Sequence, residues 1–157
     1  EQQTQTIPET SQNLILCNDI DCFIEQIKEC NPSNLTHDFG INLFGWIQNH
    51  TYYYEIKGAE NDKCRYYTRI ENVYGEYDEE TRQDFLDSNM TESEIDQQEK
   101  EVNDVLKITI GADGSCLVDE PELAEIFTNL KSGSLSFDTV SSDCEGELYS
   151  GSLYSAE

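Results

Sequence analysis

Six cysteines are the residues of this sequence whose chemistry is easiest to interpret. They are Cys17, Cys22, Cys30, Cys64, Cys116 and Cys144. Their spacing gives neither a C-x-x-C redox pair nor a zinc-ligand pattern, and only His37 and His50 could add imidazole ligands. An even number of cysteines in a short chain predicts three disulfides formed in an oxidising compartment. Spacing alone does not choose among the pairings.

Asparagine sequons indicate the same compartment. Asn34, Asn49 and Asn89 each lie in an Asn-x-Ser/Thr sequon and are predicted glycosylation sites. The sequence has no apolar run long enough to span a bilayer and no basic-then-apolar leader. We therefore interpret the chain as a mature extracellular or cell-surface protein from which a signal peptide has been removed, with no direct insertion into a membrane.

Motifs of the common enzyme classes do not occur in the sequence. G-x-S-x-G, H-E-x-x-H, the P-loop and G-x-G-x-x-G are all missing. Neither histidine has a spacing that supports a catalytic triad, and acidic pairs are too numerous to mark a catalytic site. We expect no catalytic residue, no cofactor and no dedicated metal centre, and we do not expect an enzyme.

The charge of the chain limits its partners. With 9 basic and 33 acidic side chains the formal net charge is −24. Such a chain lacks the basic face that nucleic acid requires, and an anionic membrane surface would repel it. Cations and glycans are compatible with this charge. Loose calcium binding could involve Asp19 and Asp21, or Asp113, although GADGSCLVDE lacks the alternation of an EF-hand loop.

A helix is expected around the first cysteines. Over residues 18–30 a single apolar stripe recurs at helical spacing, formed by Ile20, Phe23, Ile24 and Ile27. A second helical region covers residues 78–106, where Thr91 and Glu94 form a capping box. Its apolar residues are sparse, so we expect an acidic, solvated insertion. A last helix begins after Asp119 and ends near Gly133.

Strands are expected between the first helix and the insertion. NLTHDFGINL alternates apolar and polar residues, and two further strands follow in WIQNHTYYYEIKG and CRYYTRIENVYGEY. Seven tyrosines in this region favour sheet packing, with a sugar-binding aromatic platform as the alternative. Asp113-Gly114 predicts a hairpin within LKITIGADGSCLV. One more strand is expected near Cys144.

These elements predict an α+β fold stabilised by disulfides. An N-terminal helix would pack on an antiparallel β-meander, with the acidic helical insertion at about 78–106 and a C-terminal helix. We expect an extended N-terminal arm over residues 1–16, a single domain over residues 17–147 and a C-terminal tail over residues 148–157.

One set of segments resembles a known group of proteins. The run DCFIEQIKEC…FGINLFG…TYYYEIKG…DKCRYYTRIE, followed by TESEIDQQEKE and GADGSC, is similar to small secreted proteins predicted from uncultured archaea with small genomes. The similarity covers roughly residues 17–147, and the YEIKG turn and Cys64 are its most specific parts. The resemblance implies that the protein is secreted and that Cys30 and Cys64 form a disulfide, but it implies no activity. The order of helix and meander also resembles cystatin-like folds, whose Q-x-V-x-G protease-binding hairpin is missing here.

The N-terminal arm suggests a function. Residues 2–16 contain one acidic residue, Glu9, and are rich in Gln and Thr. Its candidate anchors are Thr4, Thr6, Ile7, Leu14, Ile15 and Leu16. We expect the arm to be donated as a strand to a neighbouring subunit, which gives a head-to-tail homo-oligomer and an extracellular, pilus-like filament. The alternative is a monomeric secreted or surface-tethered domain that binds a glycan, a cation or a protein.

Overall fold

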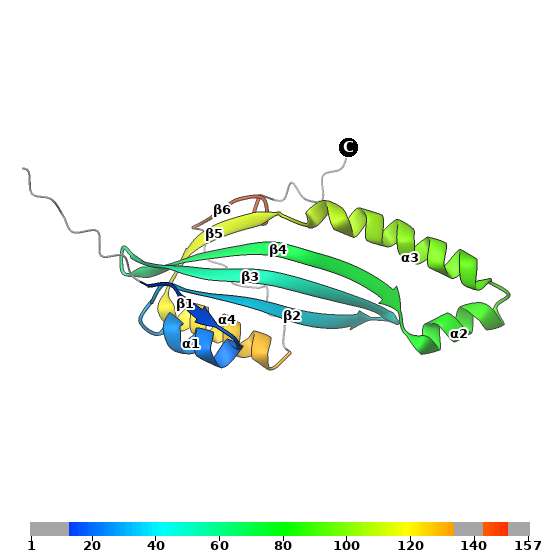
Figure 1. Ribbon diagram of the computed structural model, residues 1–157, viewed down its shortest axis with the longest axis horizontal. Coiled ribbons are helices and arrows are strands. Elements are labelled where there is room, and N and C mark those ends of the chain that lie inside the picture. The colour runs from blue at the N-terminus through cyan, green and yellow to red at the C-terminus, as the bar shows by residue number, and fades with distance from the viewer. Residues whose placement is uncertain (1–12, 134–142, 151–157) are drawn as a thin grey trace, which may run out of the picture.

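The computed structural model describes residues 13–133 and 143–150, and within them the chain is an α+β protein with one six-stranded mixed sheet and four α-helices. The elements are β1 (Ile15–Cys17), α1 (Ile20–Ile27), β2 (Ser33–Leu43), β3 (Trp46–Glu60), β4 (Lys63–Tyr77), α2 (Glu79–Asp87), α3 (Glu92–Leu106), a 3₁₀ turn (Lys107–Thr109), β5 (Asp113–Val118), α4 (Glu120–Lys131) and β6 (Cys144–Glu145). The strands follow the sheet in chain order from β1 to β6 (Figure 1).

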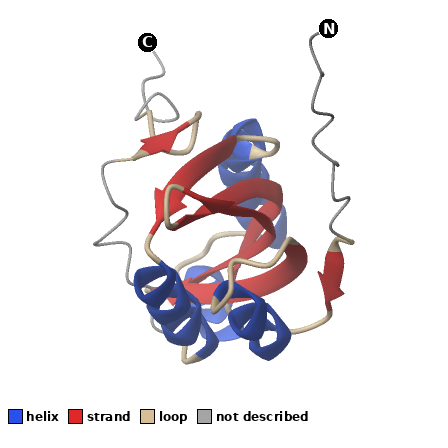
Figure 2. Cartoon of the chain, turned by 90° about the vertical axis from the view of Figure 1, so that its left-hand side faces the viewer, coloured by secondary structure: helices blue, strands red, loops and turns tan. Residues whose placement is uncertain are grey.

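The sheet is antiparallel except at its first strand. β2, β3 and β4 pair over almost their whole lengths, and β5 pairs with the first part of β4. β1 instead runs parallel to β2, with Ile15 opposite Ser33 and Cys17 opposite Leu35. The sequence did not predict this parallel strand. Seen from the left-hand side of Figure 1, the sheet is strongly twisted, and β1 and β6 lie at opposite borders (Figure 2).

Two helices bury their apolar stripes against one face of the sheet. The carboxylate of Asp19 caps α1 by accepting a hydrogen bond of 2.8 Å from the amide of Cys22. Phe23 of α1 and Phe127 of α4 are fully buried and meet edge to face, with ring centroids 4.8 Å apart. The main core continues into the strands through Leu35 and Ile56. Both helices lie on the same side of the sheet (Figure 1).

The predicted hairpin at Asp113-Gly114 is wrong. Both residues begin a single strand, β5, and the segment before it is the 3₁₀ turn that ends α3. Gly114 is needed for close packing, because a Cβ atom there would lie 2.4 Å from a ring carbon of Tyr149. The turn into the strand falls at Gly111, which has a positive φ of 90°.

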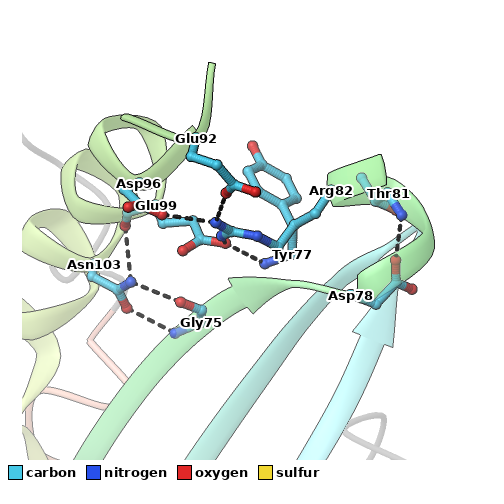
Figure 3. Close-up of polar contacts among 9 residues, drawn as sticks. All are labelled: Gly75, Tyr77, Asp78, Thr81, Arg82, Glu92, Asp96, Glu99 and Asn103. Carbon is cyan, nitrogen blue, oxygen red and sulfur yellow. Dashed lines mark hydrogen bonds and ion pairs between the residues drawn. The ribbon is translucent and has the colours of Figure 1, made fainter. Parts of the chain in front are cut away.

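The acidic insertion forms helices α2 and α3, as the capping box predicted. The amide of Glu94 donates to the Thr91 hydroxyl, and the Glu94 carboxylate accepts from the Thr91 amide. Ile95 is the one residue of α3 that is fully buried. Arg82 of α2 holds the two helices together by contacting three carboxylates of α3 at 2.6–2.8 Å (Figure 3).

All six cysteines form disulfides. Cys17–Cys22 joins β1 to α1, and Cys116–Cys144 joins β5 to β6. Cys30–Cys64, the pairing implied by the archaeal resemblance, links the segment after α1 to the start of β4 with a Cα–Cα distance of 5.2 Å. The bonds therefore hold both borders of the sheet and the helix-covered core.

Candidate functional site

Most of the outer edge of β2 has no neighbouring strand in the described part of the chain. β1 covers only Ser33–Leu35, and in the described part of the chain no strand pairs with residues 36–43 on the side away from β3. An uncovered edge offers a row of backbone N–H and C=O groups to another strand. The edge of residues 36–43 is therefore a candidate site for strand addition.

The direction of β1 separates this edge from the N-terminal segment of its own chain. Because β1 runs parallel to β2, the chain that leads into Ile15 approaches from the Ser33 end of β2. Beyond Cys17 the chain turns at once into α1. The chain thus enters β1 at the end of β2 that is away from residues 36–43, and the turn into α1 prevents β1 from continuing along them.

The composition of the edge does not discourage pairing. Proteins commonly protect exposed edges with Lys, Pro or inward-pointing charges. Residues 36–43 contain one formally charged side chain, Asp38, whose carboxylate accepts a hydrogen bond from the Thr51 hydroxyl. At the end of the strand Leu43 is half exposed and Phe44 is fully exposed, with a positive φ of 57°. Apolar surface therefore continues from the edge into the β2–β3 turn.

The tyrosine cluster divides between the two faces of the sheet. Tyr54 and Tyr66 lie on the helix-covered face, where both rings pack edge to face on Phe127. Burial raises the pKa of both phenols well above the usual 10, so they stay neutral. Tyr53 and Tyr67 lie on the outer face and meet at 67° with centroids 6.3 Å apart. The expectation of sheet packing describes the first pair.

The two histidines also lie on the helix-covered side of β2 and β3. The His50 ring stacks on Phe39 with centroids 5.0 Å apart, and its Nε2 lies 2.9 Å from the Gln48 amide. Its Nδ1 is buried and has no hydrogen-bond partner among the described residues. Burial lowers the pKa of His50, and burial lowers that of His37 despite the nearby Asp38. Both imidazoles are therefore neutral at pH 7.

The outer face carries an unusual set of cations beside rings. The Lys57 ammonium lies 4.6 Å from the Tyr67 ring centroid, and the Arg69 guanidinium lies 5.4 Å from that of Tyr53. The Tyr67 hydroxyl donates to Asp113 at 3.0 Å. Lys57, Tyr67 and Asp113 line an open groove of about 590 Å³ between the β3–β4 turn and β5–β6.

The residues considered for calcium each have a protein partner. Asp19 caps α1, Asp21 accepts from the Lys131 ammonium at 2.6 Å, and Asp113 accepts from Tyr67. In residues 13–133 and 143–150 no three His, Cys, Asp or Glu side chains gather as metal ligands. Every helix in these ranges is too short or too polar to cross a membrane.

The sequons occupy two kinds of position. Asn89 is exposed between α2 and α3, with a positive φ of 69°. Asn34 and Asn49 are partly buried within β2 and β3, and the Asn34 amide donates to the Tyr53 hydroxyl at 3.3 Å. Asn89 is therefore the sequon with the best access for glycosylation, which stays a prediction.

The expected arm is only partly described. Thr4, Thr6 and Ile7 lie outside the described residues. Leu14 is exposed, whereas Ile15 and Leu16, expected as anchors in a neighbour, form β1 in the sheet of their own chain. Donation can therefore involve only the segment that precedes β1.

Comparison of the chain with protein-family models, curated proteins and solved structures finds no significant match.

Proposed function

We propose that the protein is a structural subunit of an extracellular filament, in which the N-terminal segment of one subunit adds a strand to the edge of β2 in the next. The observation that supports this proposal is the uncovered edge of residues 36–43, which β1 does not reach because the chain turns into α1 after Cys17. The three disulfides suit an oxidising, extracellular location.

Length and residue type are compatible with this pairing. Eight residues of acceptor edge span roughly 26 Å at the usual strand rise, and residues 1–14 can extend to roughly 46 Å. Thr4, Thr6 and Ile7 are β-branched residues that favour extended structure. Each subunit would have one donor and one acceptor, so contacts would be head to tail and would grow a filament unless they closed into a ring.

The first test is electron microscopy of the full chain beside a chain lacking residues 1–12. Regular filaments from the full chain and dispersed particles from the truncated chain would support the proposal, provided that the truncated chain keeps its three disulfides. Dispersed monomers from both chains would refute it.

A second pair of variants tests the acceptor. Ile41→Lys places a charge in the open edge and should abolish filaments, whereas Ile47→Lys lies on β3, which is paired on both sides, and should preserve them. Mixing Ile41→Lys with the truncated chain joins an intact donor to an intact acceptor. The mixture should contain 1:1 heterodimers and nothing larger, whereas failure to form heterodimers would contradict strand donation.

The second candidate is a monomeric secreted or surface-tethered binding domain. The groove beside Lys57 and Tyr67 favours it, independently of the β2 edge. Dispersed monomers of both chains in the electron-microscopy test would favour this binding domain over the filament.

A further inference from the structure

The groove on the outer face is an open concave surface lined by both charged and apolar residues. It lies between the β3–β4 turn and the β5–β6 pair, none of which belongs to the open edge of β2. Its lining residues are Lys57, Gly58, Ala59, Glu60, Arg65, Tyr67, Asp113, Gly114, Ser115, Glu145 and Gly146. It therefore constitutes a second site, separate from the assembly edge.

A β-bulge places Lys57 beside this groove. The register of β3 and β4 shifts between Ile56 and Gly58, which leaves Lys57 as the extra residue. Bulges re-aim side chains and recur next to functional sites. Among the nine basic side chains, all of which lie in the described ranges, Lys57 is the one without an ion pair there. Its ammonium lies over Tyr67 and keeps free hydrogen-bond donors.

The polar lining alternates donors with acceptors. Arg65 holds Glu60 through two hydrogen bonds of 2.8 and 2.9 Å, which fixes both groups at the rim. Asp113 accepts from Tyr67 and retains further acceptor sites, and Glu145 is 81% exposed. Three carboxylates, those of Glu60, Asp113 and Glu145, thus line the same groove as the Lys57 ammonium.

The balance of charge selects the ligand class. The lining contains two basic and three acidic side chains, within a chain of net charge −24. A polyanion would be repelled, and no cluster of ligands for a cation is present in the described residues. A sugar hydroxyl both donates and accepts, so it can bridge neighbouring ammonium and carboxylate groups.

Most of the remaining lining residues have small, apolar side chains or none. Gly58, Ala59 and Gly146 leave the backbone accessible beside the carbon surface of Tyr67. Such a floor can contact the C–H groups of a sugar ring. We propose that this groove binds a neutral carbohydrate, with Lys57 and Asp113 as the principal hydrogen-bonding residues. This inference names a ligand for the binding-domain candidate and does not depend on filament assembly.

Titration calorimetry of the full chain tests the proposal. The probes are neutral hexasaccharides of glucose, mannose and N-acetylglucosamine, with hexagalacturonate as the acidic comparison. At least one neutral probe should bind, and Lys57→Ala and Asp113→Ala should each weaken that binding at least about tenfold, which corresponds to the loss of a charge-assisted hydrogen bond. Tyr74→Phe, an exposed tyrosine on the same strand as Tyr67 but outside the groove, should leave the affinity unchanged.

Several outcomes would overturn the assignment. These are no binding of any neutral probe, tighter binding of hexagalacturonate, or equal affinities for all variants while their three disulfides and their cooperative unfolding are intact. Ile41→Lys, which should block assembly, should bind the same probe as the unaltered chain. Sugar binding by this variant therefore tests the groove proposal independently of the filament proposal.

Discussion

The side-chain amide of Asn103 pairs with the backbone of Gly75 in the manner of a neighbouring strand. The Gly75 amide donates to Oδ1 and the Gly75 carbonyl accepts from Nδ2, both at 2.7 Å (Figure 3). β5 pairs only with the first part of β4, so α3 takes over the edge of β4 where β5 no longer reaches it (Figure 1). The β4 edge is therefore protected by a helix, in contrast to the edge of β2.

Asn103→Ala should lower the free energy of unfolding by about 2 kcal/mol, because it removes both hydrogen bonds to Gly75 and one to the Glu99 carbonyl, and leaves buried backbone groups of Gly75 unpaired. Urea titration measures this loss, and hydrogen exchange of the Gly75 amide should accelerate. Gln97→Ala on the same helix removes only an exposed contact with Glu101 and should change stability by less than about 0.5 kcal/mol. Equal stabilities of the two variants would contradict this role of Asn103.

The helices could be predicted from sequence because their signals are local. The apolar stripe of α1 and the Thr91–Glu94 capping box each act within a few residues, and the structure contains both of them. The conformation at Asp113-Gly114 is set by distant partners: Tyr67 bonds Asp113, and Tyr149 packs on Gly114. A turn prediction from neighbouring residues takes no account of such contacts.

The candidate sites were still less accessible to sequence analysis. The parallel pairing of Ile15 with Ser33 joins two strands that are separated in the sequence by α1, and it decides which part of β2 stays unpaired. Likewise, the bulge at Lys57 is visible only once β3 and β4 are paired. The sequence predicted an arm and a tyrosine-rich sheet, but neither the acceptor edge nor the groove.

The Cys30–Cys64 and Cys17–Cys22 disulfides should differ in their effects on stability. Removing Cys30–Cys64 by a double Ala substitution should cost about 4 kcal/mol, whereas removing Cys17–Cys22 should cost about 2 kcal/mol, because the loop each bond closes limits the entropy of the unfolded chain. The sequence separations are 34 and 5 residues. Urea unfolding of each oxidised variant measures the difference, and a larger loss for the Cys17–Cys22 variant would contradict the expectation.

The contribution of His50 to the free energy of unfolding should fall as the pH decreases from 7 towards 5. Burial lowers the pKa of His50 below 6.5 in the folded chain, so the unfolded chain binds more protons in this interval. The contribution of His50 to stability is therefore fully present above about pH 6.5 and is lost as the pH falls below it. His50→Phe retains a ring to stack on Phe39 but cannot be protonated, and it should reduce the slope of unfolding free energy against pH. Identical slopes, or an NMR-titrated pKa of His50 above 6.5, would refute this prediction.

Assembly should depend on ionic strength, because each subunit of the proposed filament has a net charge of −24. Bringing such subunits together costs Coulomb energy, which salt screens over a Debye length of roughly 10 Å at 0.1 M. The lowest protein concentration that gives filaments should therefore fall as NaCl rises from about 0.01 to 0.15 M. Backbone pairing at the β2 edge is not itself charged, so Ile41→Lys should remain unassembled at every salt concentration. Light scattering at matched ionic strength, with CaCl2 in place of NaCl, distinguishes charge screening from a bridge by a bound cation. A threshold that rises with salt would contradict charge repulsion as the opposing force, and a strict requirement for Ca²⁺ would show that a cation joins the subunits directly.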